Sequence, residues 1–182
     1  MFKIILEAFY LILPAYFANM APVIFAKLKW LEFLNKPIDG GKKLNNEFIL
    51  GTNKTWRGLV SGIIFAMIIA GIQAWLYGFQ SFYNISLFNY QESYLLFGFL
   101  AGFGAIFGDG LKSFFKRRIG IASGKSWPVL DQIDFVFGFW AFTYFIVEPS
   151  GWVTFAFFLI TLVLHPTINV IAYLLGIKKV WY

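Results

Sequence analysis

The chain has 182 residues, of which 59% are hydrophobic and 22% are aromatic, and its formal net charge is +6. A soluble domain of this length is far more polar, so the composition predicts an integral membrane protein with a single domain over residues 1–182. The chain contains no cysteine, which excludes disulfides, thiolate metal sites and cysteine nucleophiles.

Several apolar stretches are long enough to cross a membrane as helices. A hydrocarbon core roughly 30 Å thick requires about 20 apolar helical residues. The qualifying stretches run approximately over residues 4–26, 57–79, 94–115, 127–147 and 152–175. A cleavable signal peptide is an alternative for the first stretch, but its apolar run is long enough to span. We therefore expect an all-α integral membrane protein with five transmembrane helices.

The distribution of basic residues predicts the orientation of these helices. All but Lys3 of the 15 basic residues lie in residues 27–57, in residues 112–126 or in the C-terminal tail. Because Lys and Arg accumulate in cytoplasmic loops, we expect the N-terminus outside and the C-terminus and both basic loops in the cytoplasm. The same charge also favours contact with anionic head groups or nucleotides.

The third span carries an acidic residue among small residues. Asp109 lies between Gly108 and Gly110 near the cytoplasmic end of this span, and glycine lets a backbone or a phosphate approach closely. Further glycines at small-residue spacing along the span favour close helix packing. A simpler role for Asp109 is an ion pair with Lys112, three residues later.

The fourth span begins with two more acids. Asp131 and Asp134 follow Pro128, and proline is favoured in the first turn of a helix. If the helix starts there, a spacing of three residues places both carboxylates on one face. Carboxylates at a helix start are also favoured by the helix dipole alone. That explanation accounts for one such residue better than for two at membrane depth.

These three aspartates predict a magnesium site. Mg²⁺ prefers one or two carboxylates together with water and phosphate oxygens. We therefore expect Asp109, Asp131 and Asp134 to hold Mg²⁺ beside a bound phosphate chain. A zinc site is not indicated, since His165 is the single histidine of the chain.

Basic residues between the two acidic segments are candidates for phosphate contacts. Lys116, Arg117 and Arg118 follow the third span directly, and Lys125 precedes the fourth. Together with Ser113 they could hold a triphosphate, with arginine supplying bidentate contacts. A purely topological role is the alternative for each basic residue of the cluster. We expect Lys116 and Lys125 to act in catalysis alongside the aspartates.

The other basic loop runs as NNEFILGTNKTWRG over residues 45–58 and leads into the second span. Backbone amides at a helix N-terminus form a natural anion site, although the spacing is not that of a Walker A motif. The alternative is a helix-capping threonine with topological Lys54 and Arg57. The candidate nucleotide contacts from both loops are Asn46, Thr52, Asn53, Lys54, Arg57, Ser113 and Arg117.

Polar residues also occur in the first and last spans. Asn19 lies near the cytoplasmic end of the first, and His165 and Asn169 lie in the cytoplasmic half of the last. Pro166 is expected to kink the last helix and free a carbonyl. We expect Asn19, His165 and Asn169 to line the place where a lipid head group binds, while a helix–helix hydrogen bond is the alternative for His165.

The block from residue 108 to 134 resembles the signature of membrane CTP:phosphatidate cytidylyltransferases. The residues that carry the resemblance are Gly108-Asp109, Ser113, Lys116-Arg117, Lys125, Pro128 and Asp131-Gln132-Ile133-Asp134. The chain departs from that signature at Ser126, where the family has Asp, and at Gln132, where it has Arg. Val129 and Leu130 also replace a His-Gly-Gly segment and its spacer. These departures, the short chain and the Asn-Lys-Thr-Trp-Arg-Gly block at 53–58 are more similar to the CDP-archaeol synthase branch.

The resemblance implies a reaction in which CTP and a lipid phosphate give a CDP-lipid and pyrophosphate, with Mg²⁺. In the archaeal branch the lipid is 2,3-bis-O-geranylgeranylglycerol 1-phosphate. The expected partners are CTP, the lipid phosphate and the cell membrane, with no nucleic acid and an open oligomeric state. The active site is expected to face the cytoplasm.

Other functions fit parts of the pattern. A cytidylyltransferase acting on acyl lipids would show the same motifs. A CDP-alcohol phosphotransferase also uses aspartates on membrane helices, but Asp131 and Asp134 are three residues apart rather than four. A small transporter or channel subunit would use acids nearer the middle of the bilayer. A structural membrane subunit would leave the three aspartates unexplained.

Overall fold

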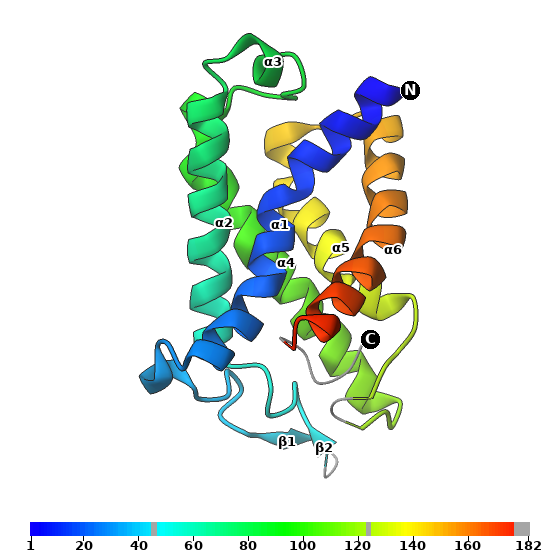
Figure 1. Cartoon of the computed structure of the whole chain (residues 1–182). Helices are drawn as coiled ribbons and strands as arrows, with labels where there is room; N and C mark the ends of the chain where they lie inside the picture. Colours follow the sequence, from blue (N-terminus) through cyan, green and yellow to red (C-terminus); the bar gives the residue numbers. More distant parts are fainter. Residues whose placement is uncertain (45–46, 123–124, 177–182) are drawn as a thin grey trace.

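The computed structural model describes residues 1–44, 47–122 and 125–176, which form a bundle of long helices (Figure 1). The long helices are α1 (Phe2–Leu28), α2 (Trp56–Leu76), α4 (Tyr90–Arg118), α5 (Leu130–Val147) and α6 (Gly151–Leu174). Five helices in the described part are long and apolar enough to cross a membrane. The prediction of an all-α membrane protein with five spans is therefore confirmed.

Short elements occupy the connections between these helices. The loop after α1 contains a 3-10 helix, η1 (Glu32–Leu34), and the strands β1 (Lys43–Leu44) and β2 (Glu47–Phe48). The strands pair antiparallel, with Lys43 opposite Phe48 and Leu44 opposite Glu47. A single turn, α3 (Gln80–Tyr83), follows α2 at the other end of the bundle. The described residues between α1 and α2 thus include short regular elements.

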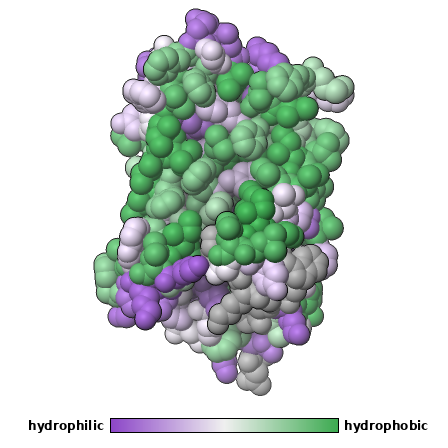
Figure 2. All heavy atoms as spheres, viewed as in Figure 1, coloured by the Kyte–Doolittle hydropathy of each residue, from purple (hydrophilic) through white to green (hydrophobic). Residues whose placement is uncertain are grey.

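The two ends of the bundle differ in what they carry. The hairpin β1–β2, the α4–α5 connection and the end of α6 lie at one end, whereas the N-terminus and α3 lie at the other (Figure 1). We call the first of these the basic end, since it collects residues 27–57 and 112–126. On the face drawn in Figure 2, an apolar band separates hydrophilic residues at the two ends. This pattern matches a chain whose helices cross a hydrocarbon layer.

Helix α4 is central and packs most extensively against α2 and α5. Gly98 and Gly102 face α2, where an added Cβ would lie 2.8 Å from the Cα of Met67 and 2.7 Å from that of Ile63, respectively. Gly104 faces α5, and a Cβ there would lie 2.6 Å from the carbonyl oxygen of Gly138. The glycines predicted to allow close packing therefore serve two neighbouring helices at once.

Helix boundaries differ from the predictions by up to four residues, as at the third span, which begins at Tyr90 rather than at residue 94. Pro128 lies in a turn rather than in the first turn of the fourth span, and α5 begins at Leu130. Val129 precedes the helix with φ of 69°. The preceding residues form no continuous helix, because this backbone conformation interrupts right-handed helical geometry. The second span ends at Leu76, so the predicted stretch to residue 79 is slightly too long.

A proline inside the last span accompanies a bend. α6 contains Pro166, and Figure 1 shows the end of this helix at an angle to its beginning. A proline in a helix interior removes one backbone hydrogen bond and clashes with the preceding turn. The hydroxyl of Thr167 donates to the carbonyl of Val163 at 2.8 Å. The predicted kink at Pro166 is present, and the part of α6 that follows it lies at the basic end (Figure 1).

Candidate active site

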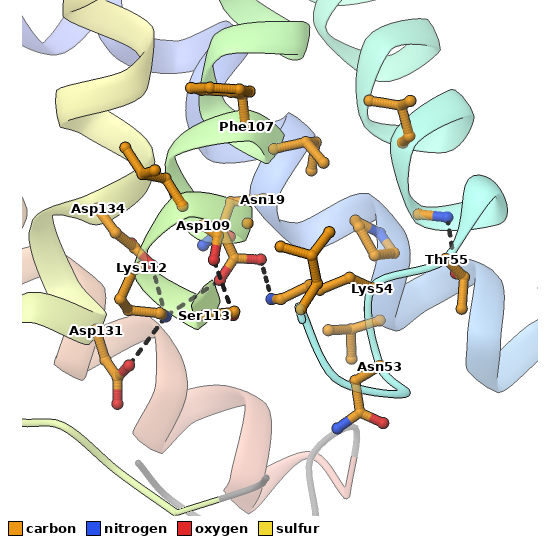
Figure 3. Close-up of a pocket in the computed structure, with 18 of the residues that line it drawn as sticks. Asn19, Asn53, Lys54, Thr55, Phe107, Asp109, Lys112, Ser113, Asp131 and Asp134 are labelled. Atoms are coloured by element: carbon orange, nitrogen blue, oxygen red, sulfur yellow. Dashed lines mark hydrogen bonds and ion pairs between the residues drawn. The ribbon is translucent and has the colours of Figure 1, made fainter. Parts of the chain in front are cut away.

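Two helices bring the three predicted aspartates together at the basic end. Asp109 lies in the last third of α4, and Asp131 and Asp134 lie in the opening turns of α5. Their side chains converge in Figure 3. The convergence depends on Gly108, because a Cβ at this position would overlap the carbonyl oxygen of Asp134. A larger residue would hold α5 away from α4 and separate the carboxylates.

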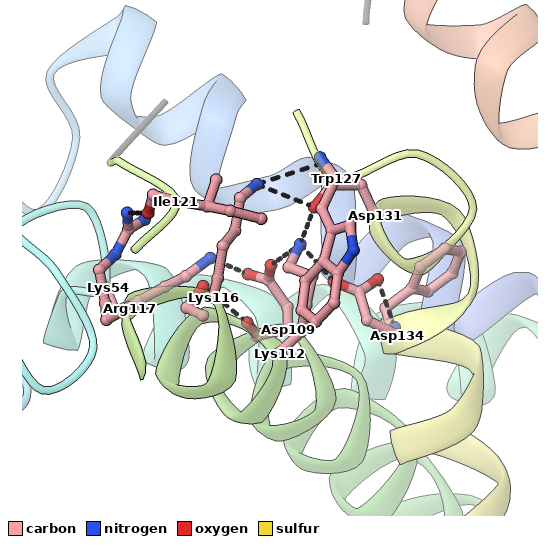
Figure 4. A network of polar contacts seen from close by, with 11 residues as sticks. Lys54, Asp109, Lys112, Lys116, Arg117, Ile121, Trp127, Asp131 and Asp134 are labelled. Carbon is pink, nitrogen blue, oxygen red and sulfur yellow. Dashed lines mark hydrogen bonds and ion pairs between the residues drawn. The ribbon is translucent and has the colours of Figure 1, made fainter. Parts of the chain in front are cut away.

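Lys112 lies in the centre of the three carboxylates. Its Nζ is 2.6 Å from Asp134 Oδ2, 2.9 Å from Asp131 Oδ1 and 3.1 Å from Asp109 Oδ1 (Figures 3 and 4). Its side chain is 13% exposed, and that of Asp134 is 4% exposed. One ammonium group thus contacts all three carboxylates, and Asp134 is the least exposed of them. The simpler role proposed for Asp109, a pair with Lys112, is present and extends to both other aspartates.

The loop before α2 contributes Lys54, whose Nζ forms an ion pair with Asp109. The backbone around it is held on both sides. The carbonyl of Lys54 accepts from the backbone N–H of Ile38 at 2.9 Å, and Thr55 Oγ1 accepts from the N–H of Gly58 at 3.2 Å as the N-cap of α2. The loop therefore supplies both the predicted capping threonine, Thr55, and a charged contact from Lys54. The two flanking hydrogen bonds hold Lys54 beside α4.

Asp131 has a second set of partners around it (Figure 4). Lys116 Nζ lies 3.2 Å from Asp131 Oδ1, and the backbone N–H of Trp127 donates to Asp131 Oδ2 at 2.5 Å. The Trp127 contact joins the α4–α5 connection to the start of α5. Asp131 is therefore fixed by a lysine from α4 and by its own N-terminal loop.

A cavity of about 940 Å³ lies beside this cluster. Its charged wall consists of Lys54, Asp109, Lys112, Lys116, Lys125, Asp131, Asp134 and Arg117. Its apolar wall comes from α1, α4 and α6, including Val23, Phe107 and Ile168. Phe107 is 46% exposed, so part of this wall also reaches the outer surface of the bundle. The cavity thus offers both charged groups, which can bind phosphate, and apolar side chains.

Most of the predicted site residues line this cavity. They are Asn19, Asn53, Lys54, Asp109, Ser113, Lys116, Arg117, Lys125, Asp131, Asp134, His165 and Asn169. The polar residues predicted from the first and last spans are therefore gathered with the charged cluster. Their positions follow from the bend of α6 and from the packing of α1 against α2, α4 and α6.

Two predicted nucleotide contacts do not line the cavity, and a third lies outside the described residues. Of the residues that the structure describes, Thr52 and Arg57 are not part of the cavity wall. Arg57 is buried and pairs with Glu32 of η1 at 2.6 Å, which ties α2 to the loop after α1. Asn46 lies outside the described residues. Arg57 and Thr52 are thus better placed to shape the loop than to touch a ligand in this cavity.

Two basic residues make contacts beyond those that the sequence predicts. Lys112 was considered for a pair with Asp109, and its spacing of three residues was the signal for that contact. Arg118 donates to the carbonyls of Leu44 and Phe48, each at 2.8 Å, and so attaches the hairpin to the end of α4. Nothing in the sequence near Arg118 indicates the hairpin, because the contact spans distant parts of the chain.

The metal-binding capacity of the cluster lies in its carboxylate oxygens. Within residues 1–44, 47–122 and 125–176, no group of three or more His, Asp or Glu side chains is arranged to hold a metal directly. The ammonium of Lys112 lies where the three carboxylates meet. A cation could use these oxygens only in place of Lys112.

Comparisons with known proteins decide the family. The family model described as CarS-like, CDP-archaeol synthase, matches residues 1–182. A CDP-archaeol synthase of Methanosarcina barkeri is 42% identical over 92% of this chain and 98% of its own length. One of Methanocaldococcus jannaschii is 34% identical over 100% of this chain and 99% of its own length. The chain belongs to the CDP-archaeol synthase family.

A solved structure agrees with this assignment. It is described as an intramembrane enzyme for archaeal membrane lipids biosynthesis, and it is 30% identical with a TM-score of 0.74. The match covers 91% of this chain and 94% of that chain. The chain is therefore a multi-pass membrane enzyme, a CTP-dependent cytidylyltransferase. Family membership removes the transporter, structural-subunit and CDP-alcohol phosphotransferase alternatives.

Proposed function

We propose that the chain transfers CMP from CTP to 2,3-bis-O-geranylgeranylglycerol 1-phosphate, giving a CDP-archaeol-type lipid and pyrophosphate. A phosphate oxygen of the lipid attacks the α-phosphorus of CTP, and the bond from that phosphorus to the pyrophosphate oxygen breaks. No protein nucleophile is needed, so the protein contributes positioning and charge stabilisation. The supporting observation is the lysine–aspartate cluster in the wall of a cavity that apolar side chains also line.

Mg²⁺ is the proposed cofactor, held by Asp109, Asp131 and Asp134. The donor set suits it, because Mg²⁺ is a hard cation that prefers carboxylate and phosphate oxygens. Oxygens of all three carboxylates already lie within 3.1 Å of one positive group, the Nζ of Lys112. When bound, the ion would neutralise charge on the phosphates of CTP during transfer.

The lysines of the cavity wall are proposed to hold the phosphate chain. Lys116 and Lys54 are in contact with the cluster, and Lys125 is an exposed residue of the cavity wall. Ammonium groups at these positions offset the negative charge that develops on departing pyrophosphate. Ser113 and Asn53, also in the wall, are proposed as neutral contacts to the nucleotide.

Arg117 is proposed to hold the α4–α5 connection in place at the wall of the cavity. Its guanidinium donates to the carbonyl of Ile121 in the α4–α5 connection. The remaining donors of the guanidinium group are suited to phosphate oxygens. Arg117 would therefore link the shape of the connection to the bound nucleotide.

Asn19, His165 and Asn169 are proposed to bind the lipid head group. All three line the cavity, and they come from α1 and α6 rather than from the charged helices. The apolar wall next to them, with Phe107 partly on the outer surface, would accept the isoprenoid chains from the bilayer. The phosphate of the lipid would then lie between the amide side chains and the lysines.

The basic end is proposed to face the cytoplasm of the cell membrane, where CTP is present. The supporting observation is the accumulation of Lys and Arg at this end. Because the chain has no cysteine, single cysteines can report sidedness. In oriented cells, Ser81→Cys should react with an impermeant maleimide from outside, and Ser126→Cys should react only after permeabilisation. The reverse pattern would contradict the orientation.

The reaction can be tested with the purified protein in detergent, radiolabelled CTP and Mg²⁺. Label should enter the organic phase when 2,3-bis-O-geranylgeranylglycerol 1-phosphate is present, with equimolar release of pyrophosphate. A saturated acyl phosphatidic acid of equal concentration should give a lower rate. Equal rates would broaden the substrate to lipid phosphates in general, and no labelled lipid from either substrate would contradict the proposed reaction.

A further inference from the structure

Lys112 differs from the other lysines of the charged cluster in how many carboxylates it contacts. Its Nζ lies within 3.1 Å of Asp109, Asp131 and Asp134, whereas Lys116 contacts Asp131. An ammonium group has three N–H donors, so three carboxylates can use its full hydrogen-bonding capacity. The three carboxylates can thus occupy every donor of Lys112.

A divalent cation and the Lys112 ammonium require the same oxygen atoms. Both are positively charged groups that bind carboxylates, and the shared position lies at the meeting point of α4 and α5. With only 13% of its side chain exposed, Lys112 leaves little access for a second cation. Binding of the ion therefore requires the ammonium to leave.

The charges explain where the ammonium would go. Three carboxylates face three lysines, namely Lys54, Lys112 and Lys116, so the cluster is neutral as it stands. A divalent cation adds two positive charges and takes the acceptors of Lys112. A displaced ammonium in a shielded cavity needs a new anion, because an unpaired buried charge is unfavourable.

The cavity provides the path for this movement. Lys112 already lines the cavity, as do Lys54 and Lys125. Its four-carbon side chain can rotate without movement of α4, because lysine is flexible and carries its charge at one point. A triphosphate in the cavity would supply the oxygens that the ammonium has lost.

We propose that Lys112 is an internal counter-ion that holds the three aspartates in the empty enzyme and moves to the nucleotide phosphates when a divalent cation binds. This inference rests on the proposed metal site. It makes metal and nucleotide binding mutually dependent. The cation adds positive charge and displaces the ammonium, and the nucleotide phosphates supply the negative charge that both need. The empty enzyme would bind a free divalent cation weakly, and the nucleotide would strengthen that binding.

A static structural role for Lys112 makes the opposite prediction. If the lysine only holds the carboxylates in place, its loss lets them repel one another and move apart. The metal site would then be weakened. If Lys112 competes with the metal, its loss removes the competitor and metal affinity rises. The direction of the change separates the two roles.

The first experiment measures Mn²⁺ affinity of the purified protein by electron paramagnetic resonance, without nucleotide or lipid. Lys112→Met should bind Mn²⁺ about tenfold more tightly than the wild type. The matched control is Lys116→Met, which removes the same charge from a lysine that contacts one carboxylate. The smaller change in Mn²⁺ affinity expected for Lys116→Met would measure the general effect of losing one positive charge. Added CTP should strengthen Mn²⁺ binding in the wild type more than in Lys112→Met.

A second measurement uses the wild type and does not depend on the folding of a variant. Lysines are methylated reductively with isotopically labelled formaldehyde, and labelling is followed by mass spectrometry. Mn²⁺ alone should increase labelling of Lys112 relative to Lys3. Lys3 is the reference because it lies near the N-terminus, at the end of the bundle opposite the basic end. Mn²⁺ and CTP together should suppress it again.

The outcomes separate this inference from the proposed function. Unchanged or weaker Mn²⁺ binding by Lys112→Met would overturn it, as would Lys112 labelling that Mn²⁺ does not alter. The proposed metal site itself is checked with Asp134→Asn, which should lose Mn²⁺ binding. If that variant binds Mn²⁺ like the wild type, the metal assignment fails and the inference fails with it.

Discussion

The two ends of the bundle use polar residues in different ways. At the basic end, lysines and aspartates from three parts of the chain share contacts beside a cavity. At the opposite end, the amide of Gln73 donates to the carbonyl of Tyr10 at 2.6 Å, and the Tyr10 hydroxyl donates to the carbonyl of Gln73 at 3.4 Å. Both Gln73 and Tyr10 are neutral and buried.

This difference separates a helix contact from a reaction site. A neutral hydrogen-bonded pair between membrane helices stabilises their packing. Charged groups at membrane depth cost free energy, so they are rare where they serve no function. Here they line a space large enough for a ligand. Polarity alone is thus a weak signal of function in this bundle. Charge beside a cavity is a stronger one.

The largest effect should come from Asp134→Asn. This change keeps the size of the side chain but removes the least exposed carboxylate of the cluster. We expect CTP-dependent pyrophosphate release to fall by about 100-fold or more at saturating Mg²⁺. The control is Glu7→Gln, which neutralises a lysine-paired carboxylate at the opposite end of the bundle and should leave activity unchanged. Activity of Asp134→Asn within about tenfold of the wild type would remove it from the metal site.

A smaller loss is expected from Gly138→Ala. A Cβ at this position would overlap the carbonyl oxygen of Gly104, so α5 must move away from α4. Overpacking of this kind costs about 1–3 kcal/mol of stability, and the shift should lower activity by about tenfold through misplaced carboxylates. Gly151→Ala is the control, because nothing lies within 4 Å of its added Cβ. Thermal unfolding in detergent and initial rates measure both effects, and equal behaviour of the two variants would contradict the close contact.

A change outside the cavity should have a still smaller effect on activity. Arg118→Met removes the contacts that attach the hairpin to α4. We expect the KM for CTP to rise by about three- to tenfold with little change in kcat, since the loop that carries Lys54 is held less firmly. Lys36→Met, which removes an exposed charge from the same loop, is the control for charge alone. A KM that rises equally in both variants would indicate a general electrostatic effect instead.

The smallest effect on activity is expected at the neutral pair. Gln73→Leu removes the hydrogen bond to Tyr10 while keeping an apolar side chain in the bundle. The stability should fall by about 1 kcal/mol, and the rate of CDP-lipid formation should stay the same. Thermal unfolding and the radiolabel assay, run on one preparation, test both statements. Reduced kcat in Gln73→Leu would mean that the two ends of the bundle are coupled.

The amino-acid sequence determined the helices and their number, and it indicated which acidic and basic residues are candidates for the site. Both follow because apolar length and charge are local properties. The spacing of Asp131 and Asp134 on α5 was also predictable, and so was the kink at Pro166. Family motifs added the reaction. These features require no knowledge of which helices are neighbours.

Only the tertiary structure decided which charges meet. It placed Lys112 between aspartates of two helices, directed Arg57 to Glu32 and attached the hairpin through Arg118. These contacts join separate elements of the chain, and those of Lys112 with α5 depend on the close approach of α4 and α5 at their glycines. A local pattern specifies a helix face, but the partner of that face is fixed by the packing of the whole bundle.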